Sequence, residues 1–425
     1  IVIGHDCRFG GTLFTEVAVK VFCANGVKVI MDKKFVSTPM ISFAVLQHKA
    51  DQGIVITASH NPPSYNGYKL KSPHGGPTSP AQIKEVEDLI PETNTIDVNG
   101  LDLEDFIAKG LVEYIDLETM YINHVEANFD MEAIRNSEMN FAYDAMYGSG
   151  QDVMRRLLPD IDFLHCEHNP GFNGTPPEPI HRNLGEFSEM IKMSEGQINC
   201  GLATDGDADR IGFFGATGQF VDSHHIILLL MKYLTEYKGM TGKVVKSFSV
   251  SDKVQILADK LGLETVTTKI GFKYICKQMV EDDVLIGAEE SGGIAIKGHV
   301  PERDGIWIGM VLWQYMAETG KSVEELIQEV YDVVGPFAVE RYDLHVSDRV
   351  KSHIIENCKS NAYTSFGEYN VLRTENIDGY KFHLDNGQWV MIRPSGTEPV
   401  LRVYAESINT ESAIQILETV KSVIL

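Results

Sequence analysis

The sequence predicts an α/β fold with a smaller α+β unit at its C-terminal end. Three stretches, 1–22, 141–158 and 244–261, follow one plan, in which an apolar strand leads through a polar or glycine-containing turn to an amphipathic helix. This alternation predicts mixed or parallel sheets covered by helices. The segment 371–403 instead contains short strands separated by turns, and a helix is expected after it from about 410 to 424.

Apolar residues at helical spacing support a helix after each of the three strands, which are expected at 2–4, 141–143 and 244–248. The apolar residues of these helices are Phe14, Val17, Val19 and Val21; Val153, Met154, Leu157 and Leu158; and Val254, Ile256, Leu257 and Leu261. The three stretches share a pattern and not residues. Three unrelated strand–helix units in one α/β protein are therefore the alternative to a repeated unit.

The C-terminal unit is delimited by turn signals. The dipeptides at 378–379 and 386–387 are Asp-Gly and Asn-Gly, which favour tight turns between strands. Pro336, which follows Gly335, marks the expected start of this unit. A chain of 425 residues is long enough for about two to four domains, so a site between domains is plausible on length alone.

Composition and charge exclude several classes of protein. Hydrophobic residues make up 43% of the chain and charged residues 23%, which is typical of a globular protein. A formal charge of −23 argues against nucleic acid or an anionic membrane as a partner. The six cysteines contain no CxxC pair, which suits reduced thiols in a cytosolic protein, so a cytoplasmic location is expected. The longest apolar runs are too short to span a bilayer.

A serine follows a predicted buried strand at 53–56. Ser59 lies in Thr-Ala-Ser-His-Asn-Pro, at 57–62, and α/β sheets place ligands just past the carboxyl ends of their strands. A serine hydroxyl is a poor nucleophile and needs a base or a metal to accept a phosphoryl group. His60 and Lys69 are near in sequence and could assist, although a polar turn without chemistry is the simpler interpretation of this segment alone.

Three carboxylates alternate along 205–210, with the sequence Asp-Gly-Asp-Ala-Asp-Arg. On an extended segment, residues i, i+2 and i+4 project to one side and could surround one cation, and hard oxygen ligands select Mg²⁺ or Ca²⁺. An EF-hand loop would have Gly and Glu where Arg210 and Ala216 stand, so that calcium loop is excluded. The pattern favours a metal site over a solvated turn.

Two further loops carry groups suited to a sugar phosphate. The segment 287–293, Gly-Ala-Glu-Glu-Ser-Gly-Gly, follows a predicted strand, and its glutamates could accept hydrogen bonds from sugar hydroxyls. The segment 393–399, Arg-Pro-Ser-Gly-Thr-Glu-Pro, combines a guanidinium with two hydroxyls and an accessible amide, which together could hold a phosphate. An acidic turn and a ligand-free hairpin are the respective alternatives.

Taken together and in this order, the motifs at 57–62, 205–210, 289–293 and 393–399 resemble those of the α-D-phosphohexomutase superfamily of phosphoglucomutases and phosphomannomutases. The likeness also includes 171–179, 268–275 and 301–305 and spans nearly the whole chain. It implies three related mixed-sheet α/β domains plus a C-terminal α+β domain around a central cleft. The implied domains are 1–115 with the phosphoserine loop, 116–225 with the metal-binding loop, 226–335 with the sugar-binding loop, and 336–425 with the phosphate-binding loop.

The resemblance also assigns roles to single residues. The implied catalytic residues are Ser59, which would carry the phosphoryl group, and His60, Lys69 and Arg210, which would flank it. The implied Mg²⁺ ligands are Asp205, Asp207, Asp209 and an oxygen of phosphorylated Ser59. The implied substrate-binding residues are Glu289 and Ser291 for the sugar hydroxyls, and Arg393, Ser395, Gly396 and Thr397 for the phosphate that is not transferred.

The implied activity is the interconversion of hexose 1-phosphate and hexose 6-phosphate through a hexose 1,6-bisphosphate, by a monomer or homodimer. Phosphomannomutase-type members often carry histidines where Phe272 and Gly293 stand, which favours glucose as the sugar, with mannose as the alternative. Family members usually begin with a strand and a glycine-arginine turn that supplies a catalytic arginine, and these 425 residues start after that point. The alternatives are a serine-phosphoenzyme phosphatase, a catalytically silent sugar-phosphate or metal-binding protein, and a phosphopentomutase or phosphoglucosamine mutase of the same family.

Overall fold

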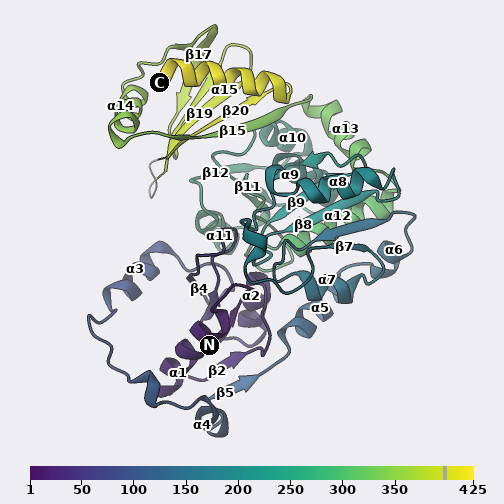
Figure 1. The fold of residues 1–425 in the computed structure, drawn as a ribbon. Helices are drawn as coiled ribbons and strands as arrows, with labels where there is room; N and C mark the ends of the chain where they lie inside the picture. The colour runs from purple at the N-terminus through teal and green to yellow at the C-terminus, as the bar shows by residue number, and fades with distance from the viewer. Residues whose placement is uncertain (396–399) are drawn as a thin grey trace.

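Four β-sheets with their helices follow one another along the chain, with the N-terminal unit at one end of the molecule and the C-terminal unit at the other (Figure 1). The computed structural model describes residues 1–395 and 400–425. Sheets A, B and C contain both parallel and antiparallel pairs, and all pairs of sheet D are antiparallel. This arrangement confirms the predicted fold class.

Sheet A has the strand order β4-β3-β1-β2-β5, in which only β4 is antiparallel to its neighbour. Its strands are β1 (Val2–His5), β2 (Val29–Met31), β3 (Gly53–Ile56), β4 (Tyr68–Lys71) and β5 (Val112–Tyr114). The helices of this part of the chain are α1 (Gly11–Ala24), α2 (Thr38–Gln47), α3 (Pro80–Asp88), η1 (Val98–Gly100) and α4 (Leu103–Ala108).

Sheet B has the order β10-β9-β8-β6-β7. Its strands are β6 (Phe141–Asp144), β7 (Asp162–Leu164), β8 (Cys200–Thr204), β9 (Ile211–Gly215) and β10 (Phe220–Val221). The helices are α5 (Leu117–Asn128), α6 (Met131–Arg135), α7 (Gln151–Leu157), η2 (Phe172–Gly174), η3 (His181–Asn183) and α8 (Gly185–Met193).

Sheet C has the order β12-β11-β13-β14. Its strands are β11 (Lys243–Ser247), β12 (Thr265–Thr268), β13 (Val284–Ala288) and β14 (Ile294–Ile296). The helices are α9 (Ser223–Lys232), which continues into the π-helical turn η4 (Tyr233–Tyr237), α10 (Lys253–Leu261), α11 (Phe272–Glu281), α12 (Gly305–Thr319) and α13 (Val323–Val334).

Sheet D has the order β15-β20-β19-β18-β17-β16. Its strands are β15 (Ala338–His345), β16 (Ser365–Phe366), β17 (Tyr369–Glu375), β18 (Tyr380–Leu384), β19 (Trp389–Pro394) and β20 (Val400–Ser407). The helices are α14 (Asp348–Lys359) and α15 (Thr410–Ile424), so the helix expected from about 410 to 424 is confirmed.

Sheets A, B and C share one four-strand arrangement. The first strand of each unit lies between the second and the third, and a fourth strand pairs antiparallel with the third: β4-β3-β1-β2, β9-β8-β6-β7 and β14-β13-β11-β12. The first strands are β1, β6 and β11, which begin within a residue of the three predicted strands. The repeated unit inferred from pattern alone is therefore correct.

Helix α1 departs from the sequence expectation in the face that it buries. Of the four apolar residues expected to mark its packing face, only Val19 is buried, whereas Phe14 and Val17 are 47% and 40% exposed. The buried face is instead formed by Thr15, Val19 and Cys23, which are spaced four residues apart and therefore lie on one side of the helix. The spacing of apolar residues therefore predicted the position of the helix correctly, but it did not predict which face is buried.

One hydrophobic core joins the first three units, and the fourth has its own. The main cluster includes residues of α2, α5, β6, α9 and α12. A separate cluster lies between sheet D and its helices. A small group formed by Phe248, Trp389, Met391 and Tyr404 lies where the third and fourth units meet. Within the residues that the structure describes, no helix has the length and apolar character needed to cross a lipid bilayer.

Helix α12 is the centre of the main core. Its residues from Gly305 to Met316 are all buried. The Trp313 ring stacks on Phe141 of sheet B at a centroid distance of 4.6 Å. A Cβ on Gly309 would lie 2.3 Å from Leu202 of β8, so glycine permits the close approach of helix and sheet. The third unit is thereby locked against the second.

We expect Trp313→Ala to destabilise the protein by about 3–5 kcal/mol, because the removed ring leaves a cavity between α12 and sheet B. The thermal-unfolding midpoint should fall by several degrees. Val280→Ala on α11 is the control, because Val280 is 48% exposed and its truncation should leave the midpoint nearly unchanged. Equal midpoints for both variants would contradict the central place of α12 in the core.

Candidate active site

Ser59 lies just past β3 in a strained backbone conformation. Its φ is +51°, in the left-handed region that residues with a Cβ rarely occupy. Its amide donates a hydrogen bond to Thr57 Oγ1 at 2.8 Å. Its hydroxyl donates to Asp205 Oδ2 at 2.6 Å, and Asp205 belongs to the second unit. The hydroxyl is thus fixed against a carboxylate from another part of the chain.

Arg8 holds the loop that carries Ser59. Its Nη2 donates to the carbonyl oxygens of Ser59 and of Asn61, the latter at 2.7 Å, and its Nη1 donates to the carbonyl oxygen of Pro62 at 2.9 Å. The guanidinium lies over the Phe172 ring at 4.9 Å, so the second unit covers it from the other side. One buried guanidinium therefore fixes the strained loop by bonding to its carbonyl oxygens.

The three carboxylates predicted at 205, 207 and 209 converge in the loop between β8 and β9. One ligand oxygen from each lies within 4.8 Å of the others, and all three residues are buried. The loop is a turn and not the extended segment assumed from sequence, with Ala208 at a φ of +57°. The turn is closed by Asp205 Oδ1, which accepts from the amides of Asp209 at 2.9 Å and Arg210 at 3.1 Å.

Two cations and a hydroxyl surround the acidic trio. Lys69 Nζ lies 2.9 Å from Asp207 Oδ2 and 3.7 Å from Asp209 Oδ2. Arg303 Nη2 lies 2.6 Å from Asp209 Oδ2. Thr38 Oγ1 donates to Asp207 Oδ2 at 2.6 Å. Residues from the first and third units therefore balance the charge of a loop that belongs to the second.

The protonation of the trio follows from these contacts. Burial, and then the neighbouring carboxylates of Asp207 and Asp209, raise the pKa of Asp205 well above its ordinary value. Burial alone would also raise the pKa of Asp207, but the Lys69 ammonium and the hydrogen bonds to the carboxylate outweigh it and hold that pKa well below its ordinary value. At neutral pH the loop thus keeps a charged Asp207 even without a metal ion.

The trio fits a divalent cation. Asp207 Oδ1 and Asp209 Oδ1 are buried, and neither has a hydrogen-bond partner among the residues that the structure describes. A buried carboxylate oxygen without a partner is costly, so a missing ligand is indicated. The donors are all carboxylate oxygens, which suit Mg²⁺ or Ca²⁺.

His60 and Arg210 flank the same site. Burial, followed by the nearby Arg210 guanidinium, lowers the pKa of His60 to about 2. His60 is therefore a neutral imidazole near neutral pH, and its buried Nδ1 has no hydrogen-bond partner in the described part of the chain. Arg210 Nη1 lies 3.7 Å from Glu178 Oε1, and Arg210 Nε lies 4.0 Å from Asp209 Oδ1.

Glu289 and Ser291 lie in the loop between β13 and β14. Glu289 Oε1 accepts a hydrogen bond from the Gly271 amide at 2.9 Å, and its Oε2 lies 3.7 Å from Arg303 Nη1. Burial raises the pKa of Glu289 to about 6, against the opposing effect of Arg303. Ser291 is partly exposed. Arg303 thus connects the sugar-binding loop expected from sequence to the acidic trio.

Arg393 is the residue before the last of β19, in the fourth unit. Its Nε lies 3.3 Å from Asp378 Oδ2, which also accepts a hydrogen bond from the Ile270 amide of the third unit at 3.0 Å. No contact within residues 1–395 and 400–425 joins Arg393 to Ser59 or the trio. The Ser395 amide donates to the Val400 carbonyl oxygen at 2.9 Å. The predicted residues Gly396 and Thr397 lie outside the described residues.

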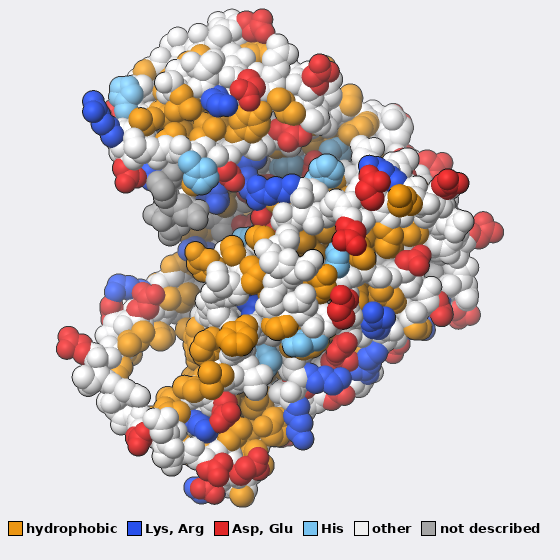
Figure 2. All heavy atoms as spheres, viewed as in Figure 1, with side chains coloured by type: hydrophobic (Ala, Val, Ile, Leu, Met, Phe, Trp, Pro, Cys, Tyr) orange, Lys and Arg blue, Asp and Glu red, His pale blue; other side chains and the backbone are white. Residues whose placement is uncertain are grey.

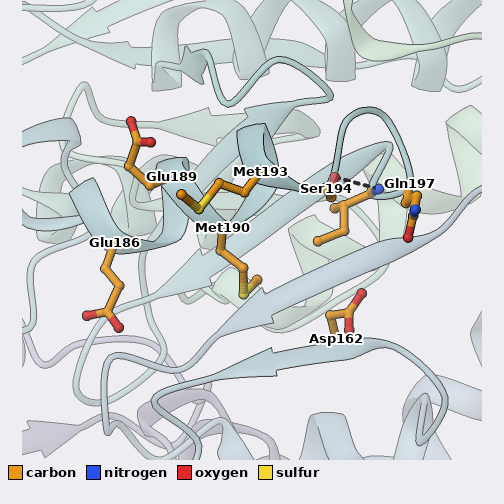
Figure 3. Close-up of a pocket in the computed structure, with 8 residues that line it drawn as sticks. Asp162, Glu186, Glu189, Met190, Met193, Ser194 and Gln197 are labelled. Atoms are coloured by element: carbon orange, nitrogen blue, oxygen red, sulfur yellow. Dashed lines mark hydrogen bonds between the residues drawn. The ribbon is translucent and has the colours of Figure 1, made fainter.

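The molecular surface is hollowed between the C-terminal unit and the first unit (Figure 2). A pocket lies elsewhere, between α8 and the edge strand β7 (Figure 3). Its lining includes Asp162, Glu186 and Glu189 beside Met190 and Met193, and no Lys or Arg. Three carboxylates and no Lys or Arg line this pocket, so its lining would repel a phosphorylated ligand.

Sequence reasoning missed Arg8, Thr38 and Arg303. Arg8 follows β1 in an Asp-x-Arg pattern, and an acidic–basic pair directly after a strand could have drawn attention to it. Arg303 lies in the 301–305 motif, which contributes to the resemblance but assigns no role to this residue. Thr38 stands at the start of α2 with no charge or pattern to distinguish it, and only the fold reveals its contact with Asp207.

Four sheet-based units and a serine held against three buried carboxylates define the class of the phosphohexomutases. Comparison with family models supports this class, because four models match successive parts of the chain. The phosphoglucomutase/phosphomannomutase α/β/α domains I, II and III match residues 1–97, 119–218 and 222–334, and the C-terminal domain matches 354–422. The chain belongs to this family, whose members are mutases of the isomerase type, within the α-D-phosphohexomutase superfamily.

Individual relatives carry several names. A phosphoglucomutase/phosphomannomutase of Thermococcus kodakarensis is 28% identical over 98% of this chain and 88% of its own length. A phosphoglucosamine mutase of Methanocaldococcus jannaschii is 29% identical over 98% of this chain and 90% of its own. A crystal structure of a Thermus thermophilus protein, provisionally named a phosphomannomutase, is 32% identical with a TM-score of 0.86 and covers 100% of this chain and 90% of that one.

A more distant solved structure includes ligands. The Aspergillus fumigatus N-acetylphosphoglucosamine mutase, 16% identical with a TM-score of 0.55 over 91% of this chain and 92% of that one, is a complex with GlcNAc-6P and magnesium. At this identity the likeness shows the fold.

We expect Asp207→Asn to weaken Mg²⁺ binding by more than about tenfold, because affinity at such sites follows the charge of the ligands. Titration of the thermal-unfolding midpoint with Mg²⁺ measures the change. Asp160→Asn is the control, because Asp160 is exposed and far from the trio in sequence. An Asp207→Asn midpoint that responds to Mg²⁺ as the unsubstituted protein does would rule out Asp207 as a ligand.

Proposed function

We propose that the protein interconverts hexose 1-phosphates and hexose 6-phosphates through a phosphorylated Ser59 and a hexose 1,6-bisphosphate. The observation that carries the proposal is the 2.6 Å hydrogen bond from the Ser59 hydroxyl to Asp205, which is one of the three buried carboxylates. A strained serine fixed against a metal-type site, in a chain of this family, is suited to accept and return a phosphoryl group.

The chemistry uses groups that are already in place. The bond between phosphorus and Ser59 Oγ breaks as a bond forms from phosphorus to a sugar hydroxyl, and the proton of that hydroxyl passes to a base. Lys69 and Arg210 supply positive charge beside the transferring oxygens. The pKa of Lys69 is raised, because Asp207 and Asp209 outweigh the effect of burial, so Lys69 stays protonated and acts as a cation.

Asp205, Asp207 and Asp209, with an oxygen of phosphorylated Ser59, are the residues that would hold Mg²⁺. When bound, this ion neutralises charge on the phosphoryl oxygens. The buried carboxylate oxygens without partners support this assignment. The magnesium in the A. fumigatus relative is consistent with it.

The bisphosphate must turn over within the site, so that its other phosphate faces Ser59. We assign the phosphate that is not being transferred to Arg393 and Ser395, together with Gly396 and Thr397, and the sugar hydroxyls to Glu289 and Ser291. The domain limits 1–115, 116–225, 226–335 and 336–425, a cytoplasmic location and a monomeric or homodimeric state remain predictions.

The preferred sugar is the least constrained part of the proposal. The absence of histidine at positions 272 and 293 favours glucose, but the relatives include phosphoglucosamine mutases at 29% identity beside a phosphoglucomutase/phosphomannomutase at 28%. Glucosamine phosphate is therefore a second candidate of equal standing. Both reactions use the same phosphoserine cycle, and only the sugar contacts would differ.

The test is an assay with Mg²⁺, a trace of the corresponding bisphosphate, and a panel of glucose, mannose, glucosamine and ribose 1-phosphates. We expect at least one 6-phosphate hexose product, followed by phosphorus NMR. Ser59→Ala should reduce turnover to below about one-thousandth, as loss of a nucleophile does in other enzymes. Intact-mass measurement should find one phosphate on the unsubstituted protein and none on Ser59→Ala.

Ser64→Ala is the matched control, because Ser64 is exposed in the same loop and its removal should leave turnover unchanged. Full turnover by Ser59→Ala would disprove the proposed nucleophile. Release of inorganic phosphate without isomerisation would instead identify a phosphatase, and ribose as the sole accepted sugar would identify a phosphopentomutase.

We expect turnover to fall as the pH drops below about 6, where Glu289 becomes protonated. The neutral carboxyl attracts Arg303 less and accepts hydrogen bonds from sugar hydroxyls less well. The substrate phosphate also titrates near pH 6, so the pH profile of Glu289→Gln is the necessary comparison. If Glu289 is responsible, Glu289→Gln should be slower and less dependent on pH between about 5 and 7. An unchanged acid limb in Glu289→Gln would assign the limb to the substrate.

A further inference from the structure

Thr38 holds Asp207 of the acidic trio at two points. The Thr38 hydroxyl donates to Asp207 Oδ2 at 2.6 Å, and the Thr38 amide donates to the Asp207 carbonyl oxygen at 3.0 Å. Thr38 belongs to the first unit and Asp207 to the second, and both residues are fully buried. The backbone and the carboxylate of Asp207 are therefore held together by one residue from a different unit.

The fold fixes Thr38 at the N-terminus of α2. Thr38 is the first residue of this helix, and the Ser37 side chain caps the helix by accepting a hydrogen bond from the Met40 amide at 3.3 Å. The first amides of a helix have no partner within the helix, so the Thr38 amide is free to donate to Asp207. All residues of α2 from Thr38 to Val45 are buried, which keeps this end of the helix in place.

The two oxygens of the Asp207 carboxylate have different surroundings. Oδ2 accepts a hydrogen bond from Thr38 Oγ1 and another from Lys69 Nζ at 2.9 Å. Oδ1 is buried and has no hydrogen-bond partner among residues 1–395 and 400–425. A carboxylate has about two acceptor sites on each oxygen, so Thr38 and Lys69 occupy Oδ2 and leave Oδ1 available to a ligand.

A role in charge balance does not explain the Thr38 hydroxyl. Lys69 already forms an ion pair with Asp207, and a hydroxyl adds no charge. The hydroxyl instead adds direction, because a lysine is a flexible point charge and fixes the rotation of a carboxylate poorly. A second donor on the same oxygen, fixed by a buried helix, determines which oxygen of Asp207 stays free.

We propose that Thr38 is a positioning residue for the metal site, which holds Oδ2 of Asp207 so that Oδ1 is presented to a divalent cation. The inference rests on the metal ligands of the proposed function. Partners behind a metal ligand fix its orientation, and their loss typically lowers metal affinity about 10- to 100-fold. Because the contact joins two units, the affinity for the cation depends on how α2 packs against the acidic loop.

The test measures Mg²⁺ binding in the absence of substrate, so it does not depend on turnover. Mg²⁺ alone is titrated, by isothermal titration calorimetry, into protein that carries no phosphate on Ser59 as checked by intact mass. We expect Thr38→Val, which removes the hydroxyl and keeps the branched shape, to bind Mg²⁺ about 10- to 100-fold more weakly. Thr38→Ser retains a hydroxyl and should restore most of the affinity.

Thr15→Val is the matched control. Thr15 is a buried threonine of the same unit, on α1, and its hydroxyl has no hydrogen-bond partner within the part of the chain that the structure describes. This substitution makes the same chemical change at a buried position away from the acidic loop, so the Mg²⁺ affinity should stay unchanged. An equal loss of affinity in Thr15→Val and Thr38→Val would contradict a specific role for Thr38.

A double-substitution cycle shows whether Thr38 acts through Asp207. We expect Thr38→Val to cause little further loss of Mg²⁺ affinity in a protein that already contains Asp207→Asn, because the carboxylate that Thr38 orients is then missing. Residues in contact show such non-additive effects. A role in folding alone would instead lower the metal-free unfolding midpoint of Thr38→Val and leave its Mg²⁺ affinity unchanged.

The outcomes separate this inference from the proposed function. Equal Mg²⁺ affinity of Thr38→Val and the unsubstituted protein would overturn the role of Thr38 and leave the metal ligands in place. A loss that adds in full to that of Asp207→Asn would also overturn it, because Thr38 would then act elsewhere. Failure of the unsubstituted protein to bind Mg²⁺ would reject the metal ligands and the inference together. Mg²⁺ affinity that depends on Thr38, in a protein that isomerises no sugar phosphate, would support the inference and reject the proposed mutase.

Discussion

The structure depends on the burial of three carboxylates in one short turn. Charges of the same sign, removed from water and placed within 4.8 Å of one another, are tolerated only with compensating partners. The partners do not come from the turn itself. Lys69 and Thr38 belong to the first unit and Arg303 to the third, while the turn belongs to the second. The site therefore exists only when three units are assembled.

The core explains how this assembly is held. Apolar residues of the first three units form one continuous cluster, and helix α12 lies buried in its middle. Arg303 lies one residue before Gly305, the first residue of α12, and the Lys71–Glu302 pair is buried beside it. Movements of one unit against another would thus break hydrophobic packing and a buried ion pair at once. A rigid frame of this kind keeps charged groups at fixed positions, as catalysis by electrostatic preorganisation requires.

Much of this was predictable from sequence. The strands that begin at Val2, Phe141 and Lys243 and the C-terminal helix were located by periodicity and turn residues, because these signals are local. The convergence of the acidic trio was also predicted, although the turn at Ala208 and not an extended segment produces it. The inner face of α1 was not predicted, because this helix buries Thr15 and Cys23 and leaves the more apolar Phe14 exposed. The contacts of Arg303 with Asp209 and Glu289 join separate segments of the chain, and no local pattern encodes them.

The hydrophobic cluster between sheet D and its helices is separate from the cluster that joins the first three units. The junction of the fourth unit with the third is formed by the Phe248 group and by polar contacts, such as those of Lys381 with Asp252 and of Asp378 with the Ile270 amide. A domain with a separate hydrophobic core depends less on its neighbours for folding, so it is easier to exchange in evolution. Chimaeras that graft this domain from one relative onto the three-unit frame of another should thus keep Ser59 beside the acidic trio, while β19 and the residue at position 393 come from the donor.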